Sequence, residues 1–165
     1  MLIRAEKPAD FDEIDDVVRA AFGQQDEVDL VRRIRSLDGY VPDLALVAVD
    51  DDGAITGHIM LSQADLDGRR VLQLAPLAVR PDHHNEGIGG ALTRAALELA
   101  DERGEPLVLV LGHPEYYPRF GFEPARARGI DSHIDGLGDE PWMVKILTNY
   151  DPSLTGTATF PAADA

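Results

Sequence analysis

The sequence contains no cysteine, which removes three classes of chemistry at once. The chain has no disulfides, no thiolate zinc site and no cysteine nucleophile. It also has no apolar run close to the roughly 18 residues that span a bilayer, and no basic and apolar leader at its N-terminus. We therefore expect a cytoplasmic protein that neither crosses nor binds a membrane.

Positive charge is scarce, with 15 basic residues against 30 acidic ones and a formal net charge of −15. Such a field repels nucleic acid and anionic membranes and favours a cationic substrate or partner. The other interpretation is a solvated acidic surface, including one adapted to high salt. An anionic ligand would then have to be bound through local dipoles, because the overall field opposes it.

The length of 165 residues and the 44% hydrophobic content predict one globular domain over residues 1–165. Neither an internal repeat nor a linker interrupts the chain, and the tail from about residue 151 is polar. Apolar spacings of three and four predict a helix over 10–22, which begins at a cap made by Asp10 and Glu13, and a second helix over 27–37.

Further along, the order of the predicted elements defines the fold class. They are strands 44–49 and 54–61 in a hairpin, strand 71–79, helix 87–103, strand 106–111, a helical turn at 115–120, an extended piece from Phe122, a surface loop over 123–141, strand 142–147 and an extended segment 155–160. This order predicts an α+β domain whose mixed, mainly antiparallel central sheet is flanked by helices.

The segment from Gln73 to Gly90 is the most informative, because a strand runs into a glycine-rich loop that opens a helix. The first turn of a helix has unpaired N–H groups and partial positive charge, and glycines let those amides approach a bulky anion. Backbone amides can therefore bind a pyrophosphate even in an acidic protein. The alternative is a glycine-rich turn that only packs helix against sheet.

Two other phosphate-binding loops fit less well. No Lys-Ser or Lys-Thr follows a glycine, as a P-loop requires. The dinucleotide fingerprint would place glycine where Leu92 stands, and an acidic residue at the end of the next strand, where Leu111-Gly112-His113 stands.

Two motifs carry a resemblance to a known family. Residues 77–79 followed by 84–92 resemble the acetyl-CoA signature of the GNAT superfamily of N-acetyltransferases, Gln/Arg-x-x-Gly-x-Gly/Ala, with His84 in place of Gln or Arg. Residues 116–122 are similar to its second signature, Tyr-x-x-x-Gly-Phe, and 111–124 resemble a bacterial subgroup of largely unassigned substrate. The resemblance implies the GNAT acyltransferase fold.

The resemblance also implies acetyl-CoA as co-substrate, no metal, and a role for each matched residue. Strand residues would hydrogen-bond the pantetheine arm, one strand amide would face the thioester oxygen, and loop amides would wrap the pyrophosphate. The cofactor-binding residues implied in this way are Leu77, Ala78, Val79, His84, Asn85, Glu86, Gly87, Ile88, Gly89 and Gly90. Tyr117, four residues before Gly121, matches the general acid of the family, although its ring is also suited to packing under the sheet.

The acceptor is a primary amine of a small molecule or peptide in this interpretation, with a cationic one favoured. Glu27, His113 and Glu115 are candidate substrate contacts, but Glu27 also suits a helix start and His113 a strand end. His83-His84 lacks a third metal ligand at useful spacing. The alternative function is a non-catalytic acetyl-CoA-binding sensor or assembly module. The sequence leaves the oligomeric state open, a homodimer included.

Overall fold

In the computed structural model, which describes residues 1–160, the chain divides into two compact units. The first unit comprises Met1–Ser62 and Ala75–Leu99, and the second comprises Gln63–Leu74 and Ala100–Ala165. Strands β3 (Ile55–Leu66) and β4 (Arg69–Val79) each contribute residues to both units.

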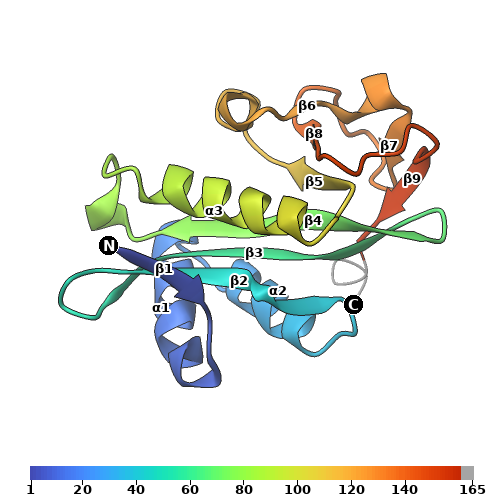
Figure 1. Ribbon diagram of the computed structural model, residues 1–165. Coiled ribbons are helices and arrows are strands. Elements are labelled where there is room, and N and C mark those ends of the chain that lie inside the picture. The colour runs from blue at the N-terminus through green and yellow to red at the C-terminus, as the bar shows by residue number, and fades with distance from the viewer. Residues whose placement is uncertain (161–165) are drawn as a thin grey trace. The chain divides into compact units, whose positions relative to one another are not determined.

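The first unit holds three helices around one part of the sheet, in which the strand order is β1-β2-β3-β4. Its elements besides β3 and β4 are β1 (Leu2–Ala5), η1 (Pro8–Asp10), α1 (Phe11–Phe22), α2 (Asp26–Arg35), β2 (Tyr40–Val49), η2 (Pro81–His83) and α3 (Ile88–Glu102) as far as residue 99. Figure 1 shows α1 and α2 on one face of these strands and α3 on the other. Both β1–β2 and β2–β3 are antiparallel.

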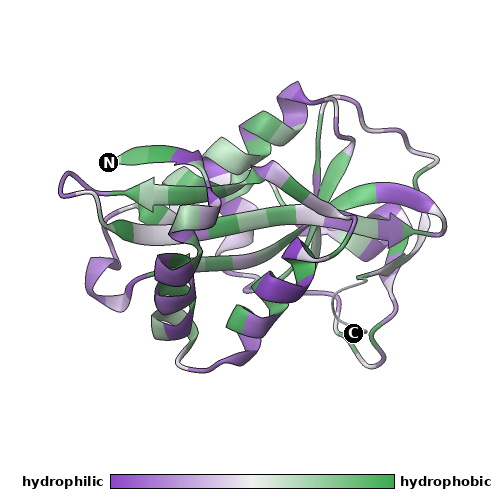
Figure 2. Ribbon diagram, turned by 90° about the horizontal axis from the view of Figure 1, so that it is seen from below, coloured by the Kyte–Doolittle hydropathy of each residue, from purple (hydrophilic) through white to green (hydrophobic). Residues whose placement is uncertain are grey.

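The core of the first unit forms because α1 repeats apolar residues at helical spacing. Ile14, Val17 and Val18 are fully buried, and they cluster with Val28, Val47, Ile55 and Ala78. Figure 2 shows hydrophobic residues along most of the strands, whereas hydrophilic residues gather in the turns and on the exposed sides of the helices. This separation is the physical basis of the predicted amphipathic helices.

The predicted cap at the start of α1 is wrong. Asp10 makes no side-chain cap for α1; its carboxylate accepts hydrogen bonds from Arg4 at 2.7 Å and from the Lys7 amide at 2.8 Å. Glu13 reaches a strand instead and accepts a hydrogen bond from the Ile55 amide at 2.9 Å. Glu13 is therefore taken by a tertiary partner, whereas Asp10 pairs with Arg4 and closes the capping box of η1 through the Lys7 amide.

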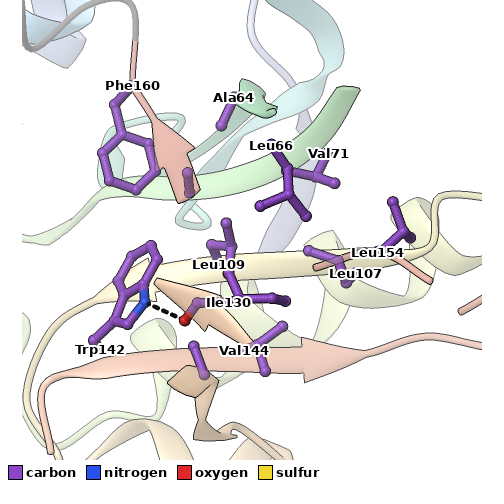
Figure 3. Close-up of a cluster of buried hydrophobic side chains, with 12 residues drawn as sticks. Ala64, Leu66, Val71, Leu107, Leu109, Ile130, Trp142, Val144, Leu154 and Phe160 are labelled. Carbon is purple, nitrogen blue, oxygen red and sulfur yellow. Dashed lines mark hydrogen bonds between the residues drawn. The ribbon is translucent and has the colours of Figure 1, made fainter. Parts of the chain in front are cut away.

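The second unit places β5 parallel to β4 and antiparallel to β8. Its elements besides β3 and β4 are β5 (Leu107–Leu111), η3 (Tyr117–Phe120), β6 (Glu123–Pro124), η4 (Ala125–Arg128), β7 (Ile130–Ser132), β8 (Trp142–Ile146) and β9 (Gly156–Thr159). In the core of this unit (Figure 3), Trp142 is fully buried and its Nε1–H donates to the Ile130 carbonyl at 3.1 Å. The sheet is thus mixed and mainly antiparallel, which confirms the predicted α+β class.

The predicted surface loop over 123–141 is wrong in part, because it contains β6, η4 and β7. Ala125 and Ile130 are fully buried despite the glycine and charge around them. The extended segment predicted over 155–160 is confirmed as β9, which pairs with β3 and β7. The polar tail is therefore structural as far as residue 160, and its last part, 161–165, lies outside the described residues.

A charged network is buried in the first unit. The Glu6 carboxylate accepts hydrogen bonds from Arg35 Nε at 2.9 Å and from the Tyr40 hydroxyl at 2.6 Å, and it lies 2.8 Å from His58 Nε2. The side chains of both Glu6 and His58 are 0% exposed. Burial alone would raise the pKa of Glu6, but the hydrogen bonds from His58 and Arg35 outweigh it and lower this pKa to about 2.

The lowered pKa of Glu6 predicts a specific loss of stability in acid. In the unfolded chain the carboxyl titrates near its ordinary value of 4.5, so its contribution is complete above that pH and is lost as pH falls toward about 2. The size is on the order of 3 kcal/mol. Urea unfolding of the wild type and of Glu6→Gln between pH 5 and 2 measures this contribution. The other carboxyl groups titrate in both proteins, so their effect cancels in the difference between the two unfolding free energies. We expect the difference in unfolding free energy to shrink as pH falls; a constant difference would contradict the assignment.

Candidate active site

The loop between β4 and α3 has the backbone geometry of an anion-binding site. β4 ends at Val79, and η2 follows immediately. Asn85 and Gly87 both adopt left-handed conformations, with φ of 70° and 78°. The first hydrogen bond of the helix runs from the Ala91 amide to the Gly87 carbonyl at 3.0 Å. The amides just before Ala91 therefore precede any intrahelical pairing.

These residues fit a phosphate group chemically. Residues 84–87 are exposed; the His84 amide donates to the Pro81 carbonyl, so the amides open to a ligand begin at Asn85. Left-handed residues alternating with ordinary ones turn successive N–H groups to one side, and the α3 dipole adds partial positive charge. Nothing lies within 4 Å of the position that a Cβ of Gly87 would take. Glycine is therefore needed there for its conformation and not for space.

Gly57 on β3 determines how closely α3 approaches the sheet, and the sequence analysis missed it. A Cβ at this position would lie 2.8 Å from Ile88 Cγ2 and 2.9 Å from Leu92 Cδ1, which is too close. The first turn of α3 therefore rests on β3 itself. A glycine inside a strand pattern signals such a close approach, so this residue was detectable.

The histidine that replaces Gln or Arg of the family pattern folds back onto the strand. His84 Nε2 lies 3.2 Å from the Val79 carbonyl oxygen, which makes the ring nitrogen the donor. The neighbouring His83 Nδ1 lies 3.1 Å from a carboxylate oxygen of Glu86. Both loop histidine side chains thus engage protein groups, and the His84 amide donates to the Pro81 carbonyl at 3.4 Å. The predicted binding of the cofactor therefore falls to the amides that follow residue 84.

Tyr117 lies in the second unit, on the turn η3, and is 8% exposed. Its ring makes edge contacts with Tyr116 at 5.1 Å and Phe122 at 5.5 Å between centroids. It covers Gly112 so closely that a Cβ there would collide with the ring. Burial, and to a lesser degree Tyr116, raises the pKa of Tyr117 to about 12. The hydroxyl therefore stays protonated throughout the physiological range, as a hydrogen-bond donor must.

The three candidate substrate contacts fall in two places. His113 and Glu115 are exposed in the turn before Tyr117, where the His113 carbonyl accepts the Tyr116 amide at 3.1 Å. Glu27 lies in the first turn of α2 and accepts a hydrogen bond from Gln24 Nε2 at 2.7 Å. Figure 1 shows α2 on the face of the first unit opposite α3.

Two searches of the described residues bear on metals and membranes. No group of three or more His, Asp or Glu residues that could hold a metal ion occurs within residues 1–160. Over the same range, no helix is both long and apolar enough to cross a membrane.

Known proteins place the chain in a family. A family model described as an acetyltransferase (GNAT) domain matches residues 2–125. The chain belongs to the GNAT acetyltransferase family. It is 37% identical over 155 residues to the uncharacterized N-acetyltransferase YjhQ of Escherichia coli K12, with 90% of this chain and 85% of the relative covered. The corresponding identity to the E. coli K12 N-acetyltransferase YhbS is 39% over 127 residues, with 76% and 75% covered.

Two solved GNAT structures have the same fold. The crystal structure of E. coli YhbS in complex with CoA matches with a TM-score of 0.91 at 30% identity, covering 99% of this chain and 92% of that one. A GNAT acetyltransferase from Brucella melitensis in complex with acetyl-CoA matches with a TM-score of 0.81 at 29% identity, covering 99% and 97%. These findings confirm the predicted family, fold and enzyme class, and agree with acetyl-CoA as the co-substrate. The residues assigned to the site stay predictions.

Proposed function

We propose that this GNAT enzyme transfers the acetyl group of acetyl-CoA to a primary amine of a small molecule or peptide. The observation that carries the proposal is the loop ahead of α3, where left-handed Asn85 and Gly87 precede the unpaired amides of the helix start. This arrangement resolves the conflict between an anionic cofactor and an acidic protein, because it binds phosphate through dipoles. The CoA and acetyl-CoA complexes of the two GNAT relatives support it.

In this proposal the main chain performs most of the binding. The amides of residues 85–90 hold the pyrophosphate, and the backbone of Leu77, Ala78 and Val79 pairs with the pantetheine arm as an added strand would. One strand amide then donates to the thioester oxygen as negative charge develops on it, the largest single source of stabilisation in many acyl transfers. The amine attacks directly, without a covalent enzyme intermediate, which suits a chain that has no cysteine.

Tyr117 supplies a proton donor for the leaving thiolate in the same proposal. Its pKa of about 12 lies well above the value of about 8.5 for a thiol, so complete transfer to a free thiolate is uphill. The hydroxyl instead donates a hydrogen bond that strengthens as charge builds on sulfur. We therefore expect an effect of about 100-fold, at the lower end of general acid catalysis.

The acidic balance of the chain favours cationic acceptors. With a net charge of −15, the field draws amines that carry an additional positive charge toward the protein. Glu27 is the acidic contact that we assign to such an acceptor, since its carboxylate is bound only at the surface by Gln24. His113 and Glu115 are exposed beside the turn that holds Tyr117 and are the further candidates.

A screen of amines for CoA release tests the function, and the acceptor charge tests its specificity. We expect a triamine to show a KM several-fold below that of a monoamine of similar length, and added salt to raise the KM of the triamine more. A preference for neutral or acidic amines would mean that the acidic residues only keep the surface solvated and do not select the acceptor. Tight binding of acetyl-CoA without release of CoA on any amine would instead favour a sensor or assembly module.

A further inference from the structure

Strand β3 has a bulge at the point where the cofactor loop leaves the sheet. In the β2–β3 ladder Ala48 pairs with Gly57 and Val49 pairs with Ile55, so Thr56 is the additional residue. A bulge interrupts the ladder locally, and main-chain groups beside it need other partners when they are buried. Ile55 is only 1% exposed, so its amide and carbonyl cannot rely on water.

Two side chains of opposite charge provide those partners. Glu13 on α1 accepts a hydrogen bond from the Ile55 amide at 2.9 Å, and Arg80 Nε donates to the Ile55 carbonyl at 2.9 Å. The Arg80 amide also donates to the Thr56 carbonyl at 2.9 Å. Hydrogen bonds from ionised groups are about twice as strong as neutral ones. The bulge is thus hydrogen-bonded to Glu13 on α1 and to Arg80, the first residue after β4.

The same stretch of β3 also holds the far end of the loop. Gly57 follows the bulge directly and lets Ile88 and Leu92 rest on β3. Figure 1 shows the end of β4, the loop and the first turn of α3 at the end of the first unit where β3 begins. Residues 55–57 therefore anchor the loop where it starts, through Arg80, and where it ends, through the start of α3.

We propose that Arg80 and Glu13 are positioning residues for acetyl-CoA, acting through the backbone of Ile55 on the amides of residues 85–90. The inference rests on the proposed cofactor site. A loop anchored at both ends samples fewer conformations before the ligand arrives, so less affinity is lost in ordering it. In this proposal neither side chain contacts the cofactor. The planar guanidinium is needed for this bond, because lysine has no donor at the position of Nε.

The test compares Arg80→Met and Glu13→Met with the control Arg4→Met, at temperatures well below each melting point. Arg4 is a partly buried arginine on β1 of the same unit, and its side chain is bonded to Asp10 at 2.7 Å. Calorimetry with CoA and steady-state kinetics with varied acetyl-CoA are measured. For Arg80→Met we expect the Kd for CoA and the KM for acetyl-CoA to rise about tenfold, while kcat at saturation stays within about twofold. This is the pattern expected when an interaction that positions the cofactor equally in the ground state and the transition state is lost.

Glu13→Met, which removes the acceptor, should weaken binding in the same direction but less. The double variant should fall short of the product of the two effects, because both act on the backbone of one residue, Ile55. Arg80→Lys should recover only part of the affinity, and Arg4→Met should lower the melting temperature alone. If the Arg80 variants lower only the melting temperature, as Arg4→Met does, the proposal is overturned. If Arg80→Met does not fold, Glu13→Met decides, since unchanged binding in it also overturns the proposal.

The same measurements separate this proposal from the cofactor site itself. A loop variant such as Gly89→Glu that binds CoA as tightly as the wild type would overturn the site. Loss of binding in Gly89→Glu together with unchanged binding in the Arg80 and Glu13 variants would overturn only the positioning role.

Discussion

Gly89→Glu is expected to weaken acetyl-CoA binding by about 100- to 1000-fold. Gly89 lies in the first turn of α3, one residue after its start at Ile88, where we place the pyrophosphate. A carboxylate about 4 Å from a phosphate costs on the order of 4 kcal/mol at the effective dielectric of a protein surface. The longer side chain also blocks the approach of the anion to the amides. Isothermal calorimetry with acetyl-CoA measures the loss.

This variant has the advantage that the loss cannot be attributed to unfolding. Gly89 does not have a positive φ, so another residue is allowed there. Glutamate has a higher helix propensity than glycine and interacts favourably with the helix dipole in the first turn. The melting temperature should therefore stay equal or rise. Leu99→Glu is the matched control, because it adds the same charge to an exposed position of the same helix. Equal binding by Gly89→Glu and Leu99→Glu would exclude the site assignment.

Tyr117→Phe is expected to slow the chemical step by about 100-fold, or about 2.7 kcal/mol, while the affinity for acetyl-CoA stays almost unchanged. The ring, its contacts with Tyr116 and Phe122, and its fit over Gly112 are all retained. Only the hydroxyl is removed, and it acts mainly as charge develops on sulfur. Single-turnover release of CoA with the best amine, beside calorimetric binding, measures the two effects separately.

Tyr116→Phe is the matched control for this experiment. Tyr116 neighbours Tyr117 and also makes an edge contact with Phe120 at 5.2 Å, so its variant reports any disturbance of the turn. We expect its single-turnover rate to stay close to that of the wild type. If Tyr117→Phe reacts as fast as Tyr116→Phe, then Tyr117 has a packing role alone.

The sequence predicted the elements whose signals are local. Helix α1 and β5 were found because their apolar residues recur at helical spacing or in one continuous run, and α3 because glycines precede an amphipathic stretch. The loop ahead of α3 was predicted for the same reason, since its conformation depends on residues within it, such as Gly87; its cofactor-binding role stays a prediction. The hydrophobic periodicity and the turn-forming residue types lie within a few neighbouring positions. They can therefore be recognised without knowing which other segment packs against them.

Features that depend on residues far apart in the chain were missed. β1 is a short edge strand that exists through its pairing with β2, and β7 lies within a segment whose composition is that of a loop. The caps assigned to Asp10 and Glu13 failed because Arg4 and the Ile55 amide compete for their carboxylates. A local pattern cannot show that a stronger partner arrives from another element.

For the candidate site, the sequence alone determined the family resemblance and predicted the phosphate-binding segment and Tyr117, because each depends on residue types at fixed short spacings. Only the tertiary structure decided what holds that segment in place. The bulge at Thr56 depends on the pairing of β3 with β2, and the close approach at Gly57 and the bond of Arg80 to β3 join residues more than twenty positions apart. The physical reason is that a buried main-chain group accepts whichever donor the fold brings within reach, and sequence spacing carries no record of that choice.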